Sequence, residues 1–237
     1  MTRIRRDAMA ARKVSVAHVA STARGFGGRS ARSRSGVPYC AGMVEKTFID
    51  ANELLLDSYR LARKIFDDGY RPDYVVGVWR GGCPIGVAVE EFLRVQQCPI
   101  KHHTAIKTQS YTGIGQSREV EVFGLEYIVS KVDAEDKVLI IDDVFDSGKT
   151  VKAILEAVRS MARRNTPEMR VACVYFKPTA NQVGIVPQYW LHETEAWLVF
   201  PHELEGLTLE ELGQKWDPEI AQIIQAPGGP FARAGEA

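Results

Sequence analysis

Apolar residues along the chain follow two kinds of spacing, one helical and one continuous. Between positions 54 and 66 they recur at helical spacing, after Asp50 and Glu53, which form a capping-box-like helix start. Gly69 and Pro72 end this predicted helix. Short apolar runs predict buried strands at 74–79, 100–106, 138–141, 171–176 and 197–200. Further helices are predicted at 84–95, 150–163 and 207–212.

The order of these elements predicts the fold class. Strands that alternate with helices indicate an α/β fold, a mainly parallel, twisted sheet flanked by helices. Residues 107–122 are polar, contain Gly113 and Gly115 and show no apolar period, which predicts a long loop. Ligands of parallel sheets bind beyond the carboxyl ends of the strands. We therefore expect the functional site at that edge.

The two ends of the chain differ in composition from the rest. Residues 1–43 hold nine basic residues and one acid, Asp7, and we expect them to form a disordered basic extension. A targeting segment is the alternative, and Met43 is a candidate functional start. Residues 44–215 are expected to form the folded domain, and 216–237 a C-terminal helix with a disordered tail.

Charge and cysteine content narrow the classes of function. The sequence holds 30 basic and 30 acidic residues, which leaves 21 basic and 29 acidic residues after position 43. A body this acidic argues against a nucleic-acid partner, because phosphate backbones require clustered Lys and Arg. No apolar run approaches the roughly 20 residues of a membrane span. Four cysteines without metal-ligand spacing favour the cytoplasm. Small molecules are therefore the expected partners.

The segment from Val138 to Thr150 carries the most specific chemistry. An apolar strand ends in Asp142 and Asp143, a third acid follows at Asp146, and Ser-Gly-Lys-Thr then opens a helix. The free N–H groups and the dipole of a helix start bind anions. Carboxylates accept hydrogen bonds from ribose hydroxyls or from waters on Mg²⁺, which prefers oxygen ligands. A ligand with a terminal phosphate, vicinal hydroxyls and a magnesium ion therefore fits this segment.

A nucleoside-triphosphate-binding P-loop is the obvious competitor, because Gly148-Lys149-Thr150 matches the end of that motif. The motif requires a glycine five positions before Gly148, and Asp143 stands there instead. Acids at this position would also repel a triphosphate. We exclude a P-loop on these grounds.

The same segment resembles the motif with which type I phosphoribosyltransferases bind phosphoribosyl pyrophosphate (PRPP). The resemblance runs from about residue 44 to 205 and is strongest to the hypoxanthine and xanthine–guanine enzymes, which act on 6-oxopurines. It implies a Rossmann-like sheet with a small hood for the purine. It assigns PRPP binding to Arg80, Gly81, Gly82, Ser110, Tyr111, Asp142, Asp143, Asp146, Ser147, Gly148, Lys149 and Thr150.

Two further segments take their roles from this resemblance. Arg80-Gly81-Gly82 is similar to the loop that meets the pyrophosphate. In related purine enzymes the peptide bond before the glycine pair can be cis, so we expect a Trp79–Arg80 bond that is cis or switches between cis and trans. Ser110-Tyr111 resembles the pair on a flexible lid that shields the reacting ribosyl cation from water.

The residues expected at the base follow the last two predicted strands. Lys177 matches the family lysine that donates to the O6 atom of the purine, and an ammonium group has donors only. Trp197 would stack on the base, and the backbone of Leu198 would read its edge. Glu203 would join Asp142 and Asp143 at the metal. His202 replaces the aromatic residue expected there and receives no role.

The implied reaction transfers a phosphoribosyl group from Mg²⁺-PRPP to a 6-oxopurine and releases pyrophosphate, with Asp146 as the catalytic acid–base residue. The resemblance also implies a homo-oligomer, a dimer or tetramer. A PRPP-sensing regulator of the same fold is one alternative, although Lys177 and Trp197 favour base binding. An enzyme for another base, such as orotate, is a second alternative, but its loop should be Lys-rich, whereas 107–122 holds only Lys107 and Arg118. Hypoxanthine, guanine and xanthine remain equivalent at this point.

Overall fold

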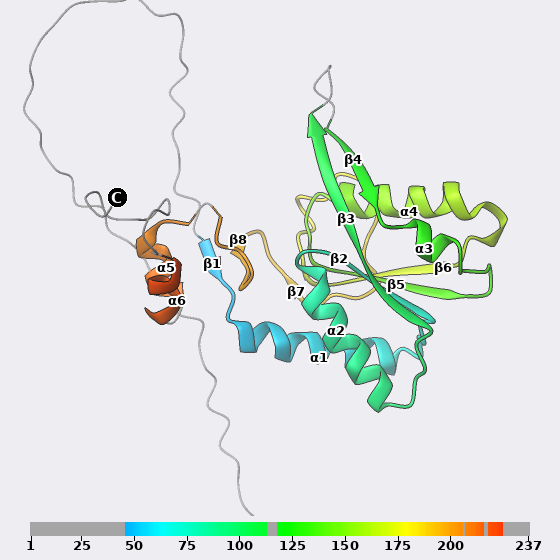
Figure 1. The fold of residues 1–237 in the computed structure, drawn as a ribbon, viewed down its shortest axis with the longest axis horizontal. Coiled ribbons are helices and arrows are strands. Elements are labelled where there is room, and N and C mark those ends of the chain that lie inside the picture. The colour runs from blue at the N-terminus through cyan, green and yellow to red at the C-terminus, as the bar shows by residue number, and fades with distance from the viewer. Residues whose placement is uncertain (1–45, 113–117, 206, 216–217, 225–237) are drawn as a thin grey trace, which may run out of the picture.

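The computed structural model describes residues 46–112, 118–205, 207–215 and 218–224 (Figure 1). The predicted basic extension at 1–43, and the tail beyond 224, lie outside the described residues. The strands are β1 (Lys46–Phe48), β2 (Tyr74–Trp79), β3 (His102–Thr112), β4 (Arg118–Phe123), β5 (Lys137–Phe145), β6 (Glu168–Phe176), β7 (His192–Glu193) and β8 (Trp197–Val199). The α-helices are α1 (Ala51–Asp67), α2 (Gly82–Val95), α3 (Glu126–Val129), α4 (Lys149–Ala162), α5 (Leu209–Lys215) and α6 (Pro218–Ile224).

A six-stranded sheet with the order β4-β3-β2-β5-β6-β7 forms the centre of the fold, and all its pairs except β3–β4 are parallel. Helices α1 and α2 cover one face, and α3 and α4 cover the other (Figure 1). Along β5, Leu139 and Ile141 belong to the core under α1 and α2, whereas Val138 and Ile140 belong to the core under α4. Burial on both faces explains why the strands appear as continuous apolar runs. The predicted mainly parallel α/β fold is confirmed.

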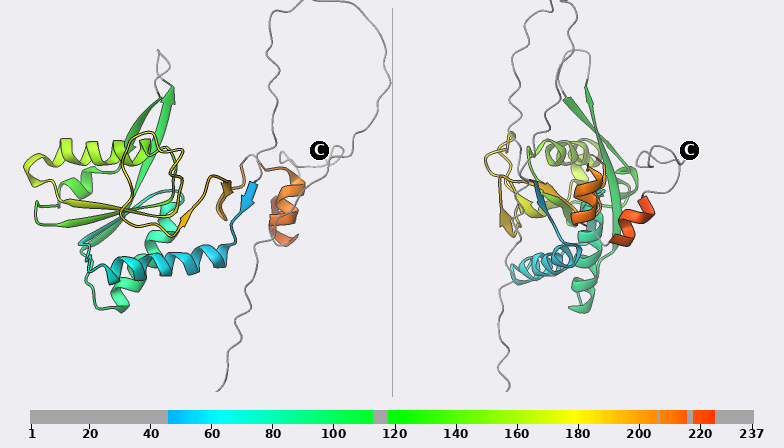
Figure 2. Two further views of the ribbon diagram at one scale, coloured as in Figure 1. Left: turned by 180° about the vertical axis from the view of Figure 1, so that it is seen from behind. Right: turned by 90° about the vertical axis from the view of Figure 1, so that its left-hand side faces the viewer.

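A second, smaller unit lies beside the N-terminal end of α1 (Figure 2). We call β1, together with the described residues from the start of β8 to the end of α6, the hood. Strands β1 and β8 pair in parallel, and the Ile49 amide extends the pairing to the Val199 carbonyl at 3.0 Å. Val199, Leu207 and Leu212 form a small core of their own. The hood thus joins segments from opposite ends of the described chain.

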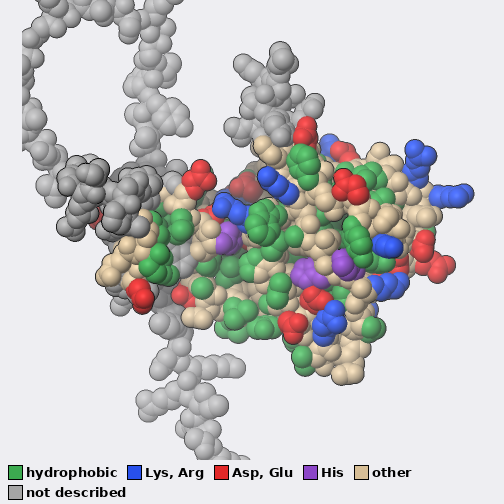
Figure 3. Space-filling model, viewed as in Figure 1, with side chains coloured by type: hydrophobic (Ala, Val, Ile, Leu, Met, Phe, Trp, Pro, Cys, Tyr) green, Lys and Arg blue, Asp and Glu red, His purple; other side chains and the backbone are tan. Residues whose placement is uncertain are grey.

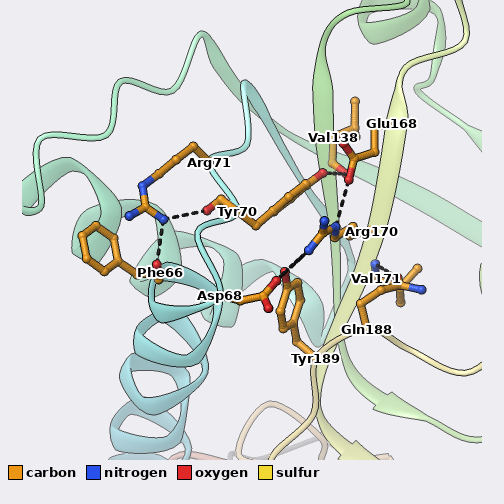
Figure 4. Close-up of polar contacts among 10 residues, drawn as sticks. All are labelled: Phe66, Asp68, Tyr70, Arg71, Val138, Glu168, Arg170, Val171, Gln188 and Tyr189. Atoms are coloured by element: carbon orange, nitrogen blue, oxygen red, sulfur yellow. Dashed lines mark hydrogen bonds and ion pairs between the residues drawn. The ribbon is translucent and has the colours of Figure 1, made fainter.

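A cluster of polar contacts fixes the end of α1 to the beginning of β6 (Figure 4). The Arg170 guanidinium lies 4.3 Å from the centroid of the Tyr70 ring and donates to Asp68 Oδ2 at 2.7 Å. The Tyr189 hydroxyl donates to the same oxygen at 2.6 Å. This hydrogen bond, together with the Arg170 charge, lowers the pKa of Asp68. Because β6 begins here, the cluster stabilises the edge of the sheet opposite the strand carboxyl ends.

The predicted loop at 107–122 is wrong. Strand β3 continues to Thr112, and β4 returns antiparallel to it, with Thr108 opposite Val122. The hairpin forms because of packing with residues distant in sequence. Val122 packs against the core under α4, while the other face of the hairpin is exposed to solvent. The alternation of charged residues with Val120 and Val122 was the available signal, but it is short.

The surface carries charges of both signs. On the face drawn in Figure 3, basic and acidic side chains are interspersed. Within the described part of the chain, no helix is long and apolar enough to cross a membrane.

Candidate active site

The acidic motif lies within β5, which is longer than the sequence predicts. Pairing of β5 with β2 ends at Ile141, opposite Gly77, whereas pairing with β6 continues to Phe145. Asp142 and Asp143 therefore follow the point at which β5 parts from β2, while β2 continues along β3 to Trp79. A gap of this kind between neighbouring parallel strands is where ligands of such sheets bind.

The two adjacent acids are held by their own backbone. The Asp143 amide donates to Asp142 Oδ1 at 3.0 Å, and the Val144 amide donates to Asp143 Oδ1 at 2.8 Å. Burial, followed by repulsion from Asp143, raises the pKa of Asp142 well above its ordinary value. The pair therefore favours a ligand that brings positive charge or hydrogen-bond donors, because either stabilises two ionised carboxylates.

The turn from Asp146 to Gly148 leads into α4, and we call Asp146–Thr150 the phosphate turn, after the role that the sequence predicts for it. Gly148 has φ = +75°, in the left-handed region, and an added Cβ would lie 2.5 Å from Val183 Cγ2. Only glycine fits both constraints. The turn and the first residues of α4 border a small cavity of about 70 Å³, lined by Asp142, Val144, Phe145, Asp146, Ser147, Gly148, Thr150 and Val151. The predicted phosphate-binding residues Ser147, Gly148 and Thr150 are thus brought together at a helix N-terminus.

A second, open cavity of about 240 Å³ adjoins the first and shares Asp142 and Thr150 with it. Its lining is Val78, Trp79, Arg80, Gly81, Thr108, Asp142, Asp143, Thr150, His202 and Glu203. Ligand sites begin at roughly 300 Å³, so neither cavity alone would hold a substrate of ordinary size. Together the two cavities bring the predicted pyrophosphate loop at Arg80 and Gly81, the acids Asp142 and Asp143, and the phosphate turn around one space.

The Arg80-Gly81-Gly82 loop packs directly on β5, and the Trp79–Arg80 bond is cis, as expected from the sequence. A Cβ on Gly81 would lie 1.8 Å from Asp143 Oδ2, and a Cβ on Gly82 would lie 2.1 Å from the Ile141 carbonyl oxygen. Both glycines are buried, and Arg80 is exposed. The glycine pair is therefore required by the close approach of the loop to the acid strand, whatever its amides bind.

Lys177 and Asp146 are in contact. Lys177 Nζ donates to Asp146 Oδ2 at 3.1 Å, and the Lys177 amide donates to the Phe145 carbonyl at 2.9 Å. The Lys177 side chain is 13% exposed and the Asp146 side chain 53%. The predicted base-binding lysine and the predicted catalytic acid thus form one ion pair at the mouth of the phosphate turn.

The hood carries the three remaining residues that the sequence predicts at the base and the metal. Trp197 is 57% exposed and lies opposite Lys46 in the β1–β8 pair, whereas Leu198 is buried. Glu203 lines the second cavity, and its Oε2 accepts a hydrogen bond from the Phe200 amide at 3.0 Å. Within the described part of the chain, no hydrogen bond, ion pair or ring contact joins Trp197 to the Lys177–Asp146 pair. The stacking role of Trp197 therefore stays a prediction.

Ser110 and Tyr111 lie on β3, opposite Val120 and Glu119 of β4, and not in the loop that the sequence predicts. Their backbones continue the regular antiparallel ladder. The lid role stays a prediction, because the turn at 113–117 lies outside the described residues.

One residue of the site was given no role from the sequence. His202 lines the second cavity, and its Nε2 lies 3.4 Å from Asp143 Oδ2. The only available signal was that an imidazole stands where an aromatic hydrocarbon side chain was expected.

A magnesium ion would meet oxygen donors here. Asp142, Asp143 and Glu203 all line the second cavity. Among the described residues, no group of three or more His, Cys, Asp or Glu side chains is arranged to hold a metal ion. Mg²⁺ commonly keeps several waters and binds one or two carboxylates plus substrate phosphates, so the donor set fits an ion that enters with its substrate.

Comparison with known proteins decides the family. The sequence profile described as "Phosphoribosyl transferase domain" matches residues 46–189, which is more than half of the chain. The chain belongs to the phosphoribosyl transferase domain family. This phosphoribosyltransferase is therefore a pentosyltransferase, from a family that generally uses PRPP with magnesium and a base as substrates. No curated protein sequence matches it.

Solved structures similar to this phosphoribosyltransferase include a purine phosphoribosyltransferase from Pyrococcus horikoshii, at 28% identity and a TM-score of 0.55, covering 69% of this chain and 97% of that one. A hypothetical protein from Neisseria gonorrhoeae with bound ppGpp has 22% identity and a TM-score of 0.57, covering 69% of this chain and 92% of that one. The second likeness concerns the fold alone.

Proposed function

We propose that this phosphoribosyltransferase transfers the 5-phosphoribosyl group of Mg²⁺-PRPP to a 6-oxopurine, giving the nucleoside monophosphate and pyrophosphate. The observation that carries the proposal is the Lys177–Asp146 pair, which sets a cation and an acceptor 3.1 Å apart beside the phosphate turn. The likeness to the Pyrococcus horikoshii purine enzyme supports a purine as the base.

The pair is complementary to one edge of a 6-oxopurine. The carbonyl oxygen O6 accepts hydrogen bonds and lies next to N7 on the same edge of the ring. An ammonium group only donates, and an ionised carboxylate only accepts. Lys177 can therefore bind O6 while Asp146 accepts a proton or hydrogen bond from N7. Adenine would present an amino group to the ammonium, and two donors repel each other.

The remaining contacts of the proposal follow the two cavities. The phosphate turn, with Ser147, Lys149 and Thr150, holds the 5-phosphate at the N-terminus of α4. Asp142 and Asp143 orient the ribose hydroxyls. Arg80 and the amides of the glycine pair balance the charge of the departing pyrophosphate, which stabilises a developing anion.

The bound magnesium ion would neutralise charge on the pyrophosphate, with Asp142, Asp143 and Glu203 as the residues able to hold it through oxygen or water. In the reaction the bond from C1 of the ribose to N9 of the base forms, and the bond from C1 to the pyrophosphate oxygen breaks, with inversion at C1. Asp146 receives the proton that leaves the base. Trp197 stacks on the purine, the Leu198 backbone reads its edge, and Ser110 and Tyr111 exclude water when the hairpin closes.

The test is the release of pyrophosphate from Mg²⁺-PRPP, measured with hypoxanthine, guanine, xanthine, adenine and orotate in turn. We expect turnover with at least one 6-oxopurine and a kcat/KM about 5- to 150-fold lower with adenine, because a mispaired buried donor costs about 1–3 kcal/mol. Adenine or orotate as the best substrate would contradict the proposal. PRPP binding without turnover on any base would favour a regulatory protein of the same fold.

A further inference from the structure

A row of aromatic and imidazole rings connects α1 to the second cavity. His202 stacks on Phe200, with ring centroids 5.7 Å apart and planes at 16°. Phe200 meets Tyr175 edge to face at 5.8 Å, and Tyr175 meets His192 at 5.1 Å. The row therefore passes from the hood through β6 to β7 and leaves little freedom for the His202 ring.

The far end of this row is anchored by a buried acid. His192 Nε2 lies 2.7 Å from Oδ2 of Asp57, and the side chain of Asp57 is 1% exposed. Arg60 Nη1 donates to the other carboxylate oxygen at 2.8 Å. Because both oxygens of Asp57 are engaged, the anchor is fixed in orientation. The ring row is thus held at α1 and ends in the cavity.

At the cavity end, His202 meets Asp143, one of the two acids that the proposed function assigns to the ribose and the metal. Its Nε2 lies 3.4 Å from Asp143 Oδ2, and the two side chains are 25% and 12% exposed. Oδ2 is also the oxygen against which Gly81 packs, whereas Oδ1 accepts from the Val144 amide at 2.8 Å. Asp143 is therefore constrained through both oxygens, and His202 contributes a contact to it from the hood.

An aromatic ring that merely filled space would need no nitrogen. A hydrocarbon ring at position 202 could stack on Phe200 equally well but could not contact a carboxylate favourably. The imidazole thus adds a polar contact to a packing role, in a cavity that also holds Arg80, Asp142 and Glu203. The polar contact is what distinguishes this chain from the pattern expected at that position.

We propose that His202 is a positioning residue for PRPP: Nε2 holds the Asp143 carboxylate toward the cavity, and the ring row holds His202. The inference rests on the proposed function and deepens it, since it couples the base-binding hood to the PRPP-binding strand. His202 acts through Asp143, so its loss should weaken PRPP binding more than base binding.

The experiment compares two variants that separate the ring from the nitrogen. H202F keeps the stack on Phe200 and lacks the nitrogen, whereas H202Q lacks the ring and places an amide near the position of Nε2. H102F is the matched control, because His102 contacts Tyr127 at the opposite edge of the sheet and its ring contact survives the change. Calorimetry measures the Kd of Mg²⁺-PRPP, steady-state assays measure the KM of PRPP and of the base, and thermal unfolding reports the fold.

We expect H202F to raise the Kd and the KM of PRPP about tenfold, as for loss of one polar contact to a carboxylate, with less than about a twofold change in the KM of the base. H202Q should recover PRPP affinity to within about threefold, and H102F should equal the wild type. Unchanged PRPP affinity in H202F, an equal rise in the KM of the base, or failure of H202Q to recover affinity would each overturn the inference alone. If the wild type does not bind PRPP, the proposed function fails and the inference falls with it.

Discussion

Replacing Gly81 by alanine tests whether the loop and the acid strand form one site. The added Cβ would lie 1.8 Å from Asp143 Oδ2 and 2.2 Å from Asp143 Cγ, distances that no pair of non-bonded atoms tolerates. Either the carboxylate rotates or the loop withdraws. Rotation breaks the hydrogen bond from the Val144 amide to Oδ1, which is 2.8 Å long.

The magnitude follows from these two losses. A hydrogen bond to a charged group contributes about 1.5–3 kcal/mol, and an off-rotamer side chain costs about 0.5–1.5 kcal/mol. Because the native carboxylate position is what PRPP requires, about 2–4 kcal/mol should appear in binding, which is an increase of about 30- to 1000-fold in the Kd of Mg²⁺-PRPP. The free energy of unfolding should fall by no more than this amount.

Calorimetry on G81A and on the control G213A decides the point. Gly213 lies in α5 with nothing within 4 Å of an added Cβ, so G213A should bind PRPP normally, and its stability should change little or rise by up to about 1 kcal/mol. If G81A binds PRPP as tightly as G213A does, the claim that the glycine loop and Asp143 shape one site is refuted. Urea unfolding of both variants shows whether the loss is local.

Three further outcomes are expected. Asp146→Asn should lower kcat by about a hundredfold or more with little change in the Kd of PRPP, as for loss of an acid–base group; near-normal kcat would remove Asp146 from the chemistry. Lys177→Ala should raise the KM of every 6-oxopurine more than the KM of PRPP, and a parallel rise in both would instead indicate disruption of the phosphate turn. The lowered pKa of Asp68 means that its contribution to stability is present above the ordinary aspartate pKa and is lost as pH falls through the lowered value. Asp68→Asn should therefore reduce the loss of stability at acid pH, measured as the free energy of urea unfolding against pH. An unchanged loss at acid pH would contradict the claim that the Asp68 contacts in Figure 4 stabilise the fold.

The features that could be predicted from sequence are those whose cause is local. The helix start at Asp50 was predicted, and the Asp50 side chain accepts hydrogen bonds from the Asn52 and Glu53 amides. The phosphate turn was predicted because strand, acids, glycine and helix start are contiguous. Gly148 confirms its special geometry with a positive φ.

The features that could not be predicted depend on distant packing. The β3–β4 hairpin needs the core under α4 to bury Val122. The dependence of Gly81 on Asp143 joins residues from two different strand ends. The contact between His202 and Asp143 joins the hood to β5 across a long stretch of chain, and no periodicity reports such a contact.

The most direct test of the central claim is chromatography of the products formed from Mg²⁺-PRPP and a purine. The account predicts that a 6-oxopurine is converted to its 5′-monophosphate in one-to-one ratio with the pyrophosphate released, and that adenine gives far less product under the same conditions. Pyrophosphate released without any nucleoside monophosphate, or adenosine monophosphate as the main product, would contradict it.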